Sequence, residues 1–387
     1  MQMQKITRDA VQELLALEDS PKVTIYIPLE ISAAPPHITE NQIRFKNLIH
    51  KAVEELQAAG DSSKLGKMLC NTLEAHYDDL DFWKVSGRGL LICATPDTMH
   101  MFQLPIDTEE YVSVDDSFHL APILALLGDT PDYYVLALAQ QKPKVYKGDM
   151  YGLELMDIGV PATMREALGI DEPNQQSENQ GSATGSSLNT GWFNGRGGAR
   201  DPQDNDRLRF FHLIDKLLCD KLDRSIPVII AGIDAEAAEY REMSKYPNIL
   251  QGIVQGNHTE TRPEELFEKV IPIVNLELVQ PEHDAVREEY ERLSGANPER
   301  VAGDTKSIMA AAEQGRIDKL LAQLSRRTTD TVQDSVNSVL RITFPEAERS
   351  KTLNNLATRV WQMSGKVVNL LPGEMPHGAT MVARLRY

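Results

Sequence analysis

Cysteine is scarce in this sequence, and its few cysteines lack the spacing of disulfide or zinc sites. The 387 residues include three cysteines, far apart in the chain: Cys70, Cys93 and Cys219. No C-x-x-C pair occurs, and the nine histidines form no H-x-x-x-H or H-x-x-E-H arrangement. We therefore expect no disulfide framework, no metal centre and no other cofactor. We expect all three cysteines to be buried as small hydrophobic residues.

Long apolar runs and an excess of positive charge are missing as well. The longest apolar candidates, Ala121–Leu127 and Val228–Ile233, are far shorter than the ~18–20 residues that span a bilayer. Residues 1–19 have the pattern of an amphipathic helix rather than of a signal peptide. The 40 Lys and Arg against 57 Asp and Glu give a net charge of −17, which repels nucleic acid at long range. We expect a cytoplasmic protein that binds neither membrane nor DNA and that contacts RNA only locally.

The charge is unevenly distributed along the chain. Residues 71–120 hold ten acidic and two basic residues, whereas residues 341–387 hold three acidic and seven basic residues. Residues 181–200 hold two arginines and no acid. Such a distribution is typical of a protein that touches an anionic surface at selected tips, but chance variation in a large acidic chain also produces it.

Hydrophobic periodicity indicates an α/β (α+β) fold in which mixed sheets are flanked by helices. The length favours two or three domains. Alternating or continuous apolar runs predict strands, and apolar residues at helical spacing predict helices. The predicted strands are Lys22–Leu29, Tyr133–Ala139, Val228–Ile233, Lys366–Leu371 and Thr380–Arg386, and the predicted helices are 39–60, Ala235–Met243, Asp284–Leu293 and Met309–Gln314. We expect three α/β domains, at residues 1–128, 129–275 and 276–387.

The central part of the chain contains an unusually long polar segment, Asp171–Asp206. It holds five hydrophobic residues and six glycines, and loops of this length are usually functional or disordered. Glycines allow close backbone approach, arginines suit phosphates, and aromatic rings stack on unpaired bases. The candidate binding residues at its centre are Trp192, Phe193, Asn194, Gly195, Arg196, Gly197, Gly198, Ala199 and Arg200. Two interpretations stay open: an RNA-binding tip, or a linker held to its own domain by its aromatic residues.

Basic residues on two predicted helices are further candidates. After the glycine-rich segment, Pro202 suits the first position of a helix, on which Arg209, His212 and Lys216 form one basic stripe. The polar face of the predicted helix 39–60 carries three more residues: Arg44, Asn47 and Lys51. That second face is either an ordinary solvated surface or an RNA-facing edge.

The glycine cluster matches neither of two common nucleotide-binding motifs. A nucleotide-binding P-loop requires Gly-Lys-Ser/Thr, but Ala199 and Arg200 follow Gly198. A dinucleotide fingerprint lies directly between a strand and a helix, whereas these glycines end a polar segment. No pairing of a nucleophile with a base is recognisable, so we expect no catalytic residue and no enzyme.

Several dispersed segments resemble one family, the bacterial relatives of archaeal and eukaryotic class I release factors and Pelota. The most similar stretches are VTIYIPLE (23–30), FHLAPILALL (118–127), YYVLALAQ (133–140), GRGGARDPQDNDRLRFFHLID (195–215), VIIAGI (228–233), AAAEQGRIDKLL (310–321) and MVARLRY (381–387). Because these blocks follow the family's order over nearly the whole chain, they are more specific than the glycine cluster alone. Within this family the chain most resembles the Balon-type ribosome hibernation factors.

The resemblance implies a three-domain release-factor/Pelota-like architecture. The N-terminal domain would face the decoding centre, with Arg44, Asn47 and Lys51 as small-subunit contacts. The central domain would carry residues 192–200 toward the peptidyl-transferase centre, supported by the basic helix. The C-terminal domain would face a translational GTPase. The implied partners are the ribosomal A site, with 16S and 23S rRNA, and elongation factor Tu, bound by a monomer.

One residue departs from the release-factor pattern. True release factors have Gly-Gly-Gln at this tip, where the glutamine helps to place water on the peptidyl-tRNA ester, but here Ala199 follows Gly197 and Gly198. A methyl group neither donates nor accepts a hydrogen bond, so it cannot position the water. The resemblance therefore implies a stress-related hibernation factor that fills the vacant A site and inhibits translation. The alternatives are a rescue factor that releases nascent peptide and a Pelota-like recruiter for stalled ribosomes.

Overall fold

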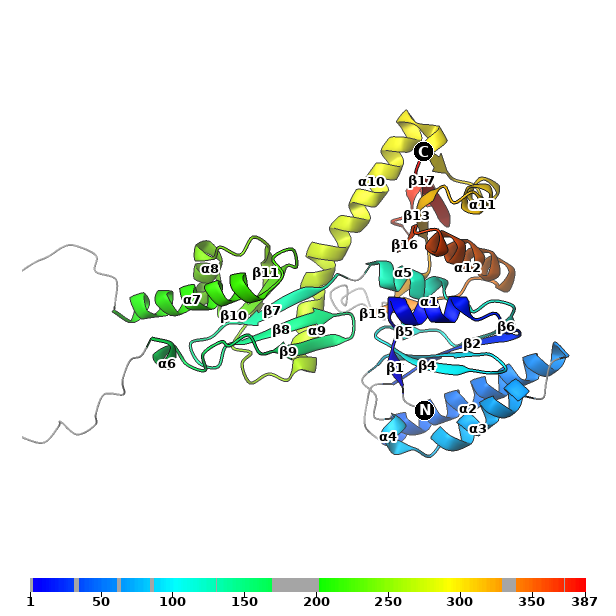
Figure 1. Cartoon of the computed structure of the whole chain (residues 1–387), viewed down its shortest axis with the longest axis horizontal. Helices are drawn as coiled ribbons and strands as arrows, with labels where there is room; N and C mark the ends of the chain where they lie inside the picture. The colour runs from blue at the N-terminus through cyan, green and yellow to red at the C-terminus, as the bar shows by residue number, and fades with distance from the viewer. Residues whose placement is uncertain are drawn as a thin grey trace, which may run out of the picture. The chain divides into compact units, whose positions relative to one another are not determined.

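The computed structural model describes residues 3–30, 35–60, 64–83, 87–129, 131–168, 202–328, 339–371 and 373–387. The chain forms two compact units: unit 1 combines Met1–Pro131 with Leu278–Tyr387, and unit 2 is Asp132–Glu277. Each unit contains at least one mixed sheet flanked by helices (Figure 1), which confirms the predicted α/β class. The division into three domains stays a prediction. Within the described residues, no helix is both long and apolar enough to cross a bilayer.

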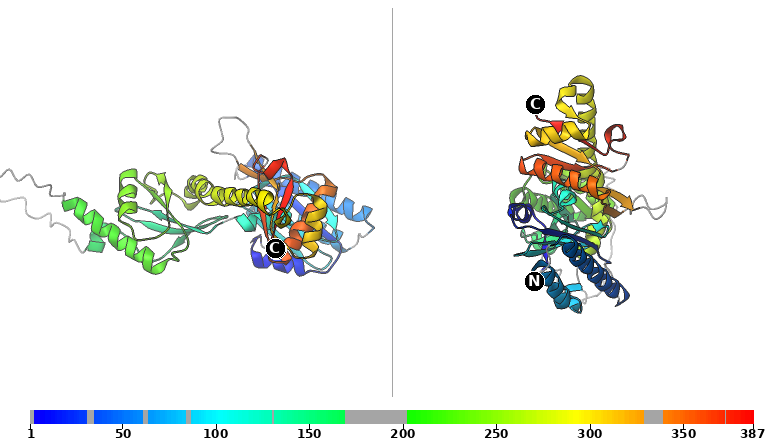
Figure 2. Two further views of the ribbon diagram at one scale, coloured as in Figure 1. Left: turned by 90° about the horizontal axis from the view of Figure 1, so that it is seen from above. Right: turned by 90° about the vertical axis from the view of Figure 1, so that its right-hand side faces the viewer.

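The N-terminal part of unit 1 is built on a five-stranded sheet of order β1-β4-β3-β2-β6. Its strands are β1 (Gln4–Lys5), β2 (Lys22–Pro28), β3 (Gly89–Ala94), β4 (Met99–Leu104) and β6 (Tyr111–Asp115), and all neighbours are antiparallel except β1 and β4. The helices are α1 (Arg8–Ala16), α2 (Pro35–Ala58), α3 (Lys64–His76), α4 (Leu80–Trp83) and α5 (Ala121–Asp129). Helices α2 and α3 cover one face, and α1 lies on the other (Figures 1 and 2).

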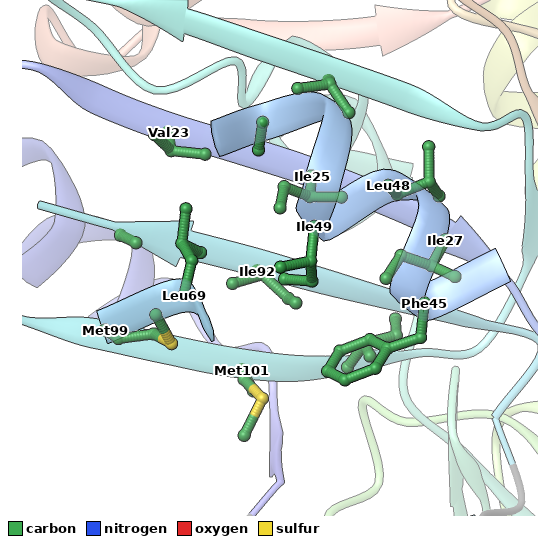
Figure 3. Close-up of a cluster of buried hydrophobic side chains, with 14 of the residues drawn as sticks. Val23, Ile25, Ile27, Phe45, Leu48, Ile49, Leu69, Ile92, Met99 and Met101 are labelled. Carbon is green, nitrogen blue, oxygen red and sulfur yellow. The ribbon is translucent and has the colours of Figure 1, made fainter. Parts of the chain in front are cut away.

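The core of this part follows from the alternation that predicted strand β2. Val23, Ile25 and Ile27 point from one face of β2 toward Phe45 and Ile49 of α2 (Figure 3), and all five are fully buried. Burial of a large apolar side chain contributes roughly 1.5–3 kcal/mol, so this face fixes the register of the sheet. The intervening side chains of β2 are buried on the opposite face, as the alternation predicts.

The C-terminal part of unit 1 contains a four-stranded sheet of order β12-β17-β13-β16. Its strands are β12 (Val301–Ala302), β13 (Ile317–Ala322), β16 (Lys366–Asn369) and β17 (Met381–Leu385). Its helical segments are α10 (Gln280–Ala296), η2 (Pro298–Arg300), α11 (Thr305–Glu313), α12 (Ala347–Gln362) and η3 (Pro376–Gly378). Gly315 ends α11 with a φ of +66°, which confirms its predicted role as a helix-terminating glycine.

A polar seam, formed by residues 118–121 and Asn354, joins the two parts of unit 1. A small sheet, β14 (Ser325–Thr328), β15 (Val339–Ile342) and β5 (Asp107–Thr108), crosses it. The side chain of Asn354 on α12 accepts hydrogen bonds from the backbone N–H groups of Leu120 (2.8 Å) and Ala121 (3.0 Å), and donates one to the carbonyl of Phe118 (2.9 Å). Helix α5 packs against β16, where a Cβ on Gly128 would lie 2.6 Å from the carbonyl oxygen of Val367. The two parts therefore share one packed interior.

Unit 2 contains a five-stranded sheet of order β11-β10-β7-β8-β9. Its strands are β7 (Tyr133–Ala137), β8 (Lys144–Asp149), β9 (Gly152–Met156), β10 (Val228–Gly232) and β11 (Ile249–Gln255). Strands β7, β10 and β11 are parallel, and the β7–β8 and β8–β9 pairs are antiparallel. The helices are α6 (Met164–Leu168), α7 (Pro202–Lys221), α8 (Asp234–Met243) and α9 (Pro263–Val274), and the π-helical turn η1 (Asn275–Val279) leads into α10.

Several sequence expectations require correction. The N-terminal helix does not begin at residue 1, because Gln4–Lys5 pair as strand β1 and Thr7 caps α1. Helix α2 begins at Pro35 rather than at Thr39, which agrees with the tolerance of the first helical turn for proline. Helix α7, by contrast, begins at Pro202, as the sequence predicted. Only Cys93 is buried, whereas Cys70 and Cys219 are half-exposed.

Candidate nucleic-acid interface

Several segments of unit 2 meet at the carboxyl edge of its sheet. Strand β9 is antiparallel to β8, as β7 is, so the carboxyl ends of β7, β9, β10 and β11 all lie at this edge. Helix α7 is 20 residues long, about 30 Å at 1.5 Å per residue, and extends past this edge (Figure 1). Helix α6 packs against α7 near the N-terminal end of α7 (Figures 1 and 2). Residues 168 and 202, which flank the glycine-rich segment, therefore emerge at one end of unit 2.

The predicted tip itself lies outside the described residues. This applies to Trp192, Phe193, Asn194, Gly195, Arg196, Gly197, Gly198, Ala199 and Arg200. Their role in binding stays a prediction. The structure describes the helix that follows them, on which the predicted basic stripe lies.

Helix α7 separates an apolar face from a basic one. Phe210, Phe211, Ile214 and Leu218 are fully buried against strands β7 and β10, together with a larger cluster of unit 2. Spacings of three and four residues place Arg209, His212 and Lys216 on the opposite face, where all three are exposed. The helix thus presents three side chains that can carry positive charge to solvent along two of its turns.

A buried carboxylate anchors this helix to α8. Asp215 is 4% exposed and accepts hydrogen bonds from the hydroxyl of Ser244, from the backbone N–H of Lys245 (3.0 Å) and from the hydroxyl of Tyr240 (3.5 Å). Burial raises the pKa of the Tyr240 hydroxyl well above its usual value, and the charge of Asp215 adds to this shift. Tyr240 therefore remains a neutral donor. The three hydrogen bonds fix the rotation of α7, and hence the direction of its basic face.

Sequence reasoning missed Asp215, although the sequence contains a signal for it. An acid one helical turn after Phe211 and directly after Ile214 lies on the apolar side of the helix. A carboxylate at such a position requires buried hydrogen-bond partners. The partners, Tyr240 and Ser244, could not be predicted, because they belong to another helix and its C-terminal cap.

Most of the basic side chains on the exposed face of α7 have no strong partner within the described residues. Arg209 forms a 3.6 Å ion pair with Asp206, but its side chain is 73% exposed, so the pair stabilises weakly. Arg207 is more strongly held, by a 2.8 Å bond from its Nε to Glu239. Among the described residues, the side chains of His212 and Lys216 have no hydrogen-bond or ion-pair partner. This distribution suits a flat anionic surface such as an RNA backbone.

The three candidates on α2 do not form one open face. Asn47 and Lys51 are exposed, together with Lys46 and His50, which the sequence reasoning left out. Arg44 is instead half-buried, 3.4 Å from Glu30 and 3.8 Å from Glu110. It lines a polar cavity of about 510 Å³ formed by Pro28, Leu29, Glu30, Arg44, Arg88, Asp107, Thr108, Glu109, Glu110 and Arg341. Arg44 is thus partly neutralised by acids, whereas Asn47 and Lys51 face solvent. The RNA contact of these three residues stays a prediction.

Metal coordination gains no support from the described part of the chain. In those ranges, no group of three or more His, Cys, Asp or Glu side chains is arranged to hold a metal ion. His119, a buried histidine, lies in the seam of unit 1. Its Nε2 is 3.2 Å from the hydroxyl of Ser350, and its Nδ1 is 3.4 Å from that of Tyr111.

Comparison with known proteins relates part of the chain to release factors. Residues 132–316 match the family model described as bacterial archaeo-eukaryotic release factor family 3. The match covers unit 2 and the beginning of the C-terminal part of unit 1, slightly less than half of the chain. It supports the predicted relation to archaeo-eukaryotic release factors for this segment. The closer similarity to Balon-type factors stays a prediction. No curated protein matches the chain in sequence.

Three solved structures show weak similarity to the chain. The archaeal translation termination factor aRF1 is 13% identical, with 98% of this chain and 96% of that chain covered and a TM-score of 0.23. Pelota of Archaeoglobus fulgidus is 14% identical, with coverage of 77% and 79% and a TM-score of 0.32. Dom34 of S. cerevisiae is 13% identical, with coverage of 81% and 77% and a TM-score of 0.35. At these identities and TM-scores, the likenesses carry no conclusion about function.

Proposed function

We propose that this protein is a ribosome-binding translation factor that fills the vacant A site and blocks translation without hydrolysing peptidyl-tRNA. The observation that carries the proposal is the exposed basic face of α7, formed by Arg209, His212 and Lys216. This face directly follows the Gly-Arg-Gly-Gly-Ala-Arg sequence, within the segment that matches a release-factor family model. An otherwise acidic protein thereby offers exposed cations on the helix that follows the glycine-rich segment in sequence, where RNA phosphates could approach.

The absence of hydrolysis is proposed from a single residue. Ala199 occupies the position at which release factors have the glutamine that helps to position water. Without that amide, a water molecule near the ester bond lacks the hydrogen bond that orients it for attack. Occupancy without chemistry is the behaviour of a hibernation factor, as in the Balon type. We also propose, from the resemblance alone, that elongation factor Tu binds together with it, at the side of residues 276–387.

Ribosome binding can be tested by co-sedimentation across a salt series. Replacing Arg209 and Lys216 together by alanine removes two cations. The slope of log affinity against log salt concentration should therefore become less steep, by an amount that corresponds to about two released counterions. Lys269→Ala is a matched control, because Lys269 is an exposed cation on α9 in the same unit. Superimposable curves for the wild type and the double variant would mean that this face does not contact RNA.

Peptide release separates the proposed function from its alternatives. Purified ribosomes carrying peptidyl-tRNA in the P site should show no release above the rate in buffer when the protein is added, although binding occurs. Release well above that rate would instead indicate a rescue factor. Splitting of the ribosome with a partner factor would indicate a recruiter of the Pelota type. Co-purification of elongation factor Tu with the ribosome-bound protein tests the proposed partner.

A further inference from the structure

The chain leaves unit 2 through one continuous helical stretch. Helix α9, the turn η1 and helix α10 follow one another without a break, and the unit boundary falls between Glu277 and Leu278, inside η1. Turn η1 is π-helical, a form that is rare and often lies at functional sites. Pro272 lies just before it, inside α9, and cannot donate a backbone hydrogen bond. The helix is thus irregular where it leaves one unit for the other.

No fully buried side chain lies among the described residues of this junction. Helix α9 buries Leu266, Val270 and Val274, and the next buried side chain is Val286 on α10. All of residues 275–285 are described, and each is at least partly exposed. Leu276, in the π-helical turn itself, is 70% exposed. Polar contacts are therefore expected to contribute to the path of the chain between Val274 and Val286.

One carboxylate connects η1 to strand β11. Glu277 accepts hydrogen bonds from the backbone N–H groups of Gln251 (2.7 Å) and Gly252 (2.5 Å) on strand β11. Consecutive N–H groups of a regular strand point in opposite directions. Here the pairing of β10 and β11 is irregular between Val228 and Ile230, so β11 bulges and both groups reach one anion.

The sequence around the bulge is fitted to this contact. A Cβ on Gly252 would lie 2.7 Å from Cγ2 of Ile273 and 2.8 Å from Oε1 of Glu277. No side chain fits there unless the side chains of Ile273 and Glu277 move. On the same bulge, Arg241 donates a 2.6 Å hydrogen bond to the carbonyl of Gln251. A glycine at position 252 therefore allows the close approach of strand β11 to the helix.

We propose that Glu277, Gln251 and Gly252 form a clasp that holds the junction helix in its π-helical register, and that opening the clasp frees the helix to change register. A π-helical turn contains one residue more than an α-helical turn. Conversion to the α register would rotate all that follows by about 100° and shift it by about 1.5 Å along the axis. The clasp is then a hinge lock for α10. This inference does not depend on ribosome binding.

Hydrogen–deuterium exchange tests whether the clasp protects its amides. Hydrogen bonds to a charged group are stronger than those between neutral groups, so Glu277→Ala should speed exchange at Gln251 and Gly252 by about ten- to a hundredfold. Glu277→Gln keeps one acceptor oxygen and should give an intermediate rate. Glu288→Ala is the matched control, because Glu288 is an exposed acid on α10. Unchanged exchange in Glu277→Ala would overturn the proposal.

Distance measurements test whether the clasp controls the hinge. Spin labels at Asn71→Cys in unit 1 and Asp220→Cys in unit 2, both exposed positions, report on the two units after Cys70 and Cys219 are replaced by serine. The distance distribution should broaden, or gain a second peak, when the clasp is opened by Glu277→Ala.

A second variant opens the clasp from the strand side. Gly252→Ala should change the distribution in the same way as Glu277→Ala, and it serves as the test if that variant does not fold. Gly295→Ala on α10, where a Cβ meets nothing within 4 Å, should not. Faster amide exchange with an unchanged distribution would overturn the proposal, since the clasp would then stabilise only β11.

Discussion

Asn354 in unit 1 and Lys216 in unit 2 are both polar residues on long helices, but their surroundings are opposite. Asn354 is 3% exposed and makes three hydrogen bonds at 2.8–3.0 Å across the seam. Lys216 is exposed and has no partner among the described residues. The side chain of Asn354 is thus fully used in folding, whereas that of Lys216 remains available to a ligand. Substitutions in the seam should therefore change stability, and substitutions on α7 should change binding.

The largest expected effect is the loss of the asparagine in the seam. Asn354→Ala would leave two buried N–H groups and one carbonyl without partners, each costing about 1–3 kcal/mol, so unfolding should become easier by about 3–5 kcal/mol. Denaturant titration of the whole chain measures this change. The neighbouring Asn355, which is exposed, is the control, and Asn355→Ala should change stability by less than about 0.5 kcal/mol. Equal losses of stability in the two variants would show that the hydrogen bonds of Asn354 do not stabilise the fold.

The sequence predicted the elements on each side of this seam better than the seam itself. The alternation in Lys22–Leu29 and the glycine at position 315 depend on neighbours in the chain, and the structure confirms both. The contact of Asn354 with Leu120 joins residues 234 positions apart, which no local pattern encodes. The same holds for Asp215 and its partners on α8. On α7 the spacing of the basic residues was sufficient, because exposure on a helix follows from periodicity alone.

Acid should weaken the seam through a buried histidine. Burial lowers the pKa of His119 to about 4, although Asp115 opposes the shift, and its usual value is near 6.5. Because the pKa of His119 is lower in the folded protein than in the unfolded chain, protonation of this side chain favours the unfolded chain. His119 therefore does not reduce stability above pH 6.5, and stability is lost as the pH falls from 6.5 toward 4. The free energy of unfolding should drop by about 2 kcal/mol between pH 7 and pH 5 from this residue alone.

Two histidine variants isolate that contribution. His119→Gln should remove most of the pH dependence assigned to the seam, at some cost in stability at neutral pH. His212→Gln, on the exposed face of α7, should leave the pH dependence as it is in the wild type. Denaturant titrations at pH 5, 6 and 7 provide the comparison. If the slopes of the wild type and His119→Gln agree, the acid sensitivity has another origin.

The smallest expected change in stability is on the basic face of α7. Arg209→Ala with Lys216→Ala removes two exposed side chains, of which only Arg209 has an ion pair, at 3.6 Å. Exposed pairs contribute little, and alanine favours the helix, so the free energy of unfolding should change by less than about 0.5 kcal/mol. A large loss of stability would mean that this face supports the fold rather than a ligand. Unchanged stability combined with weaker ribosome binding would instead separate the two uses of polar residues within one chain, because Asp215, on the buried side of the same helix, would still hold α7 in place.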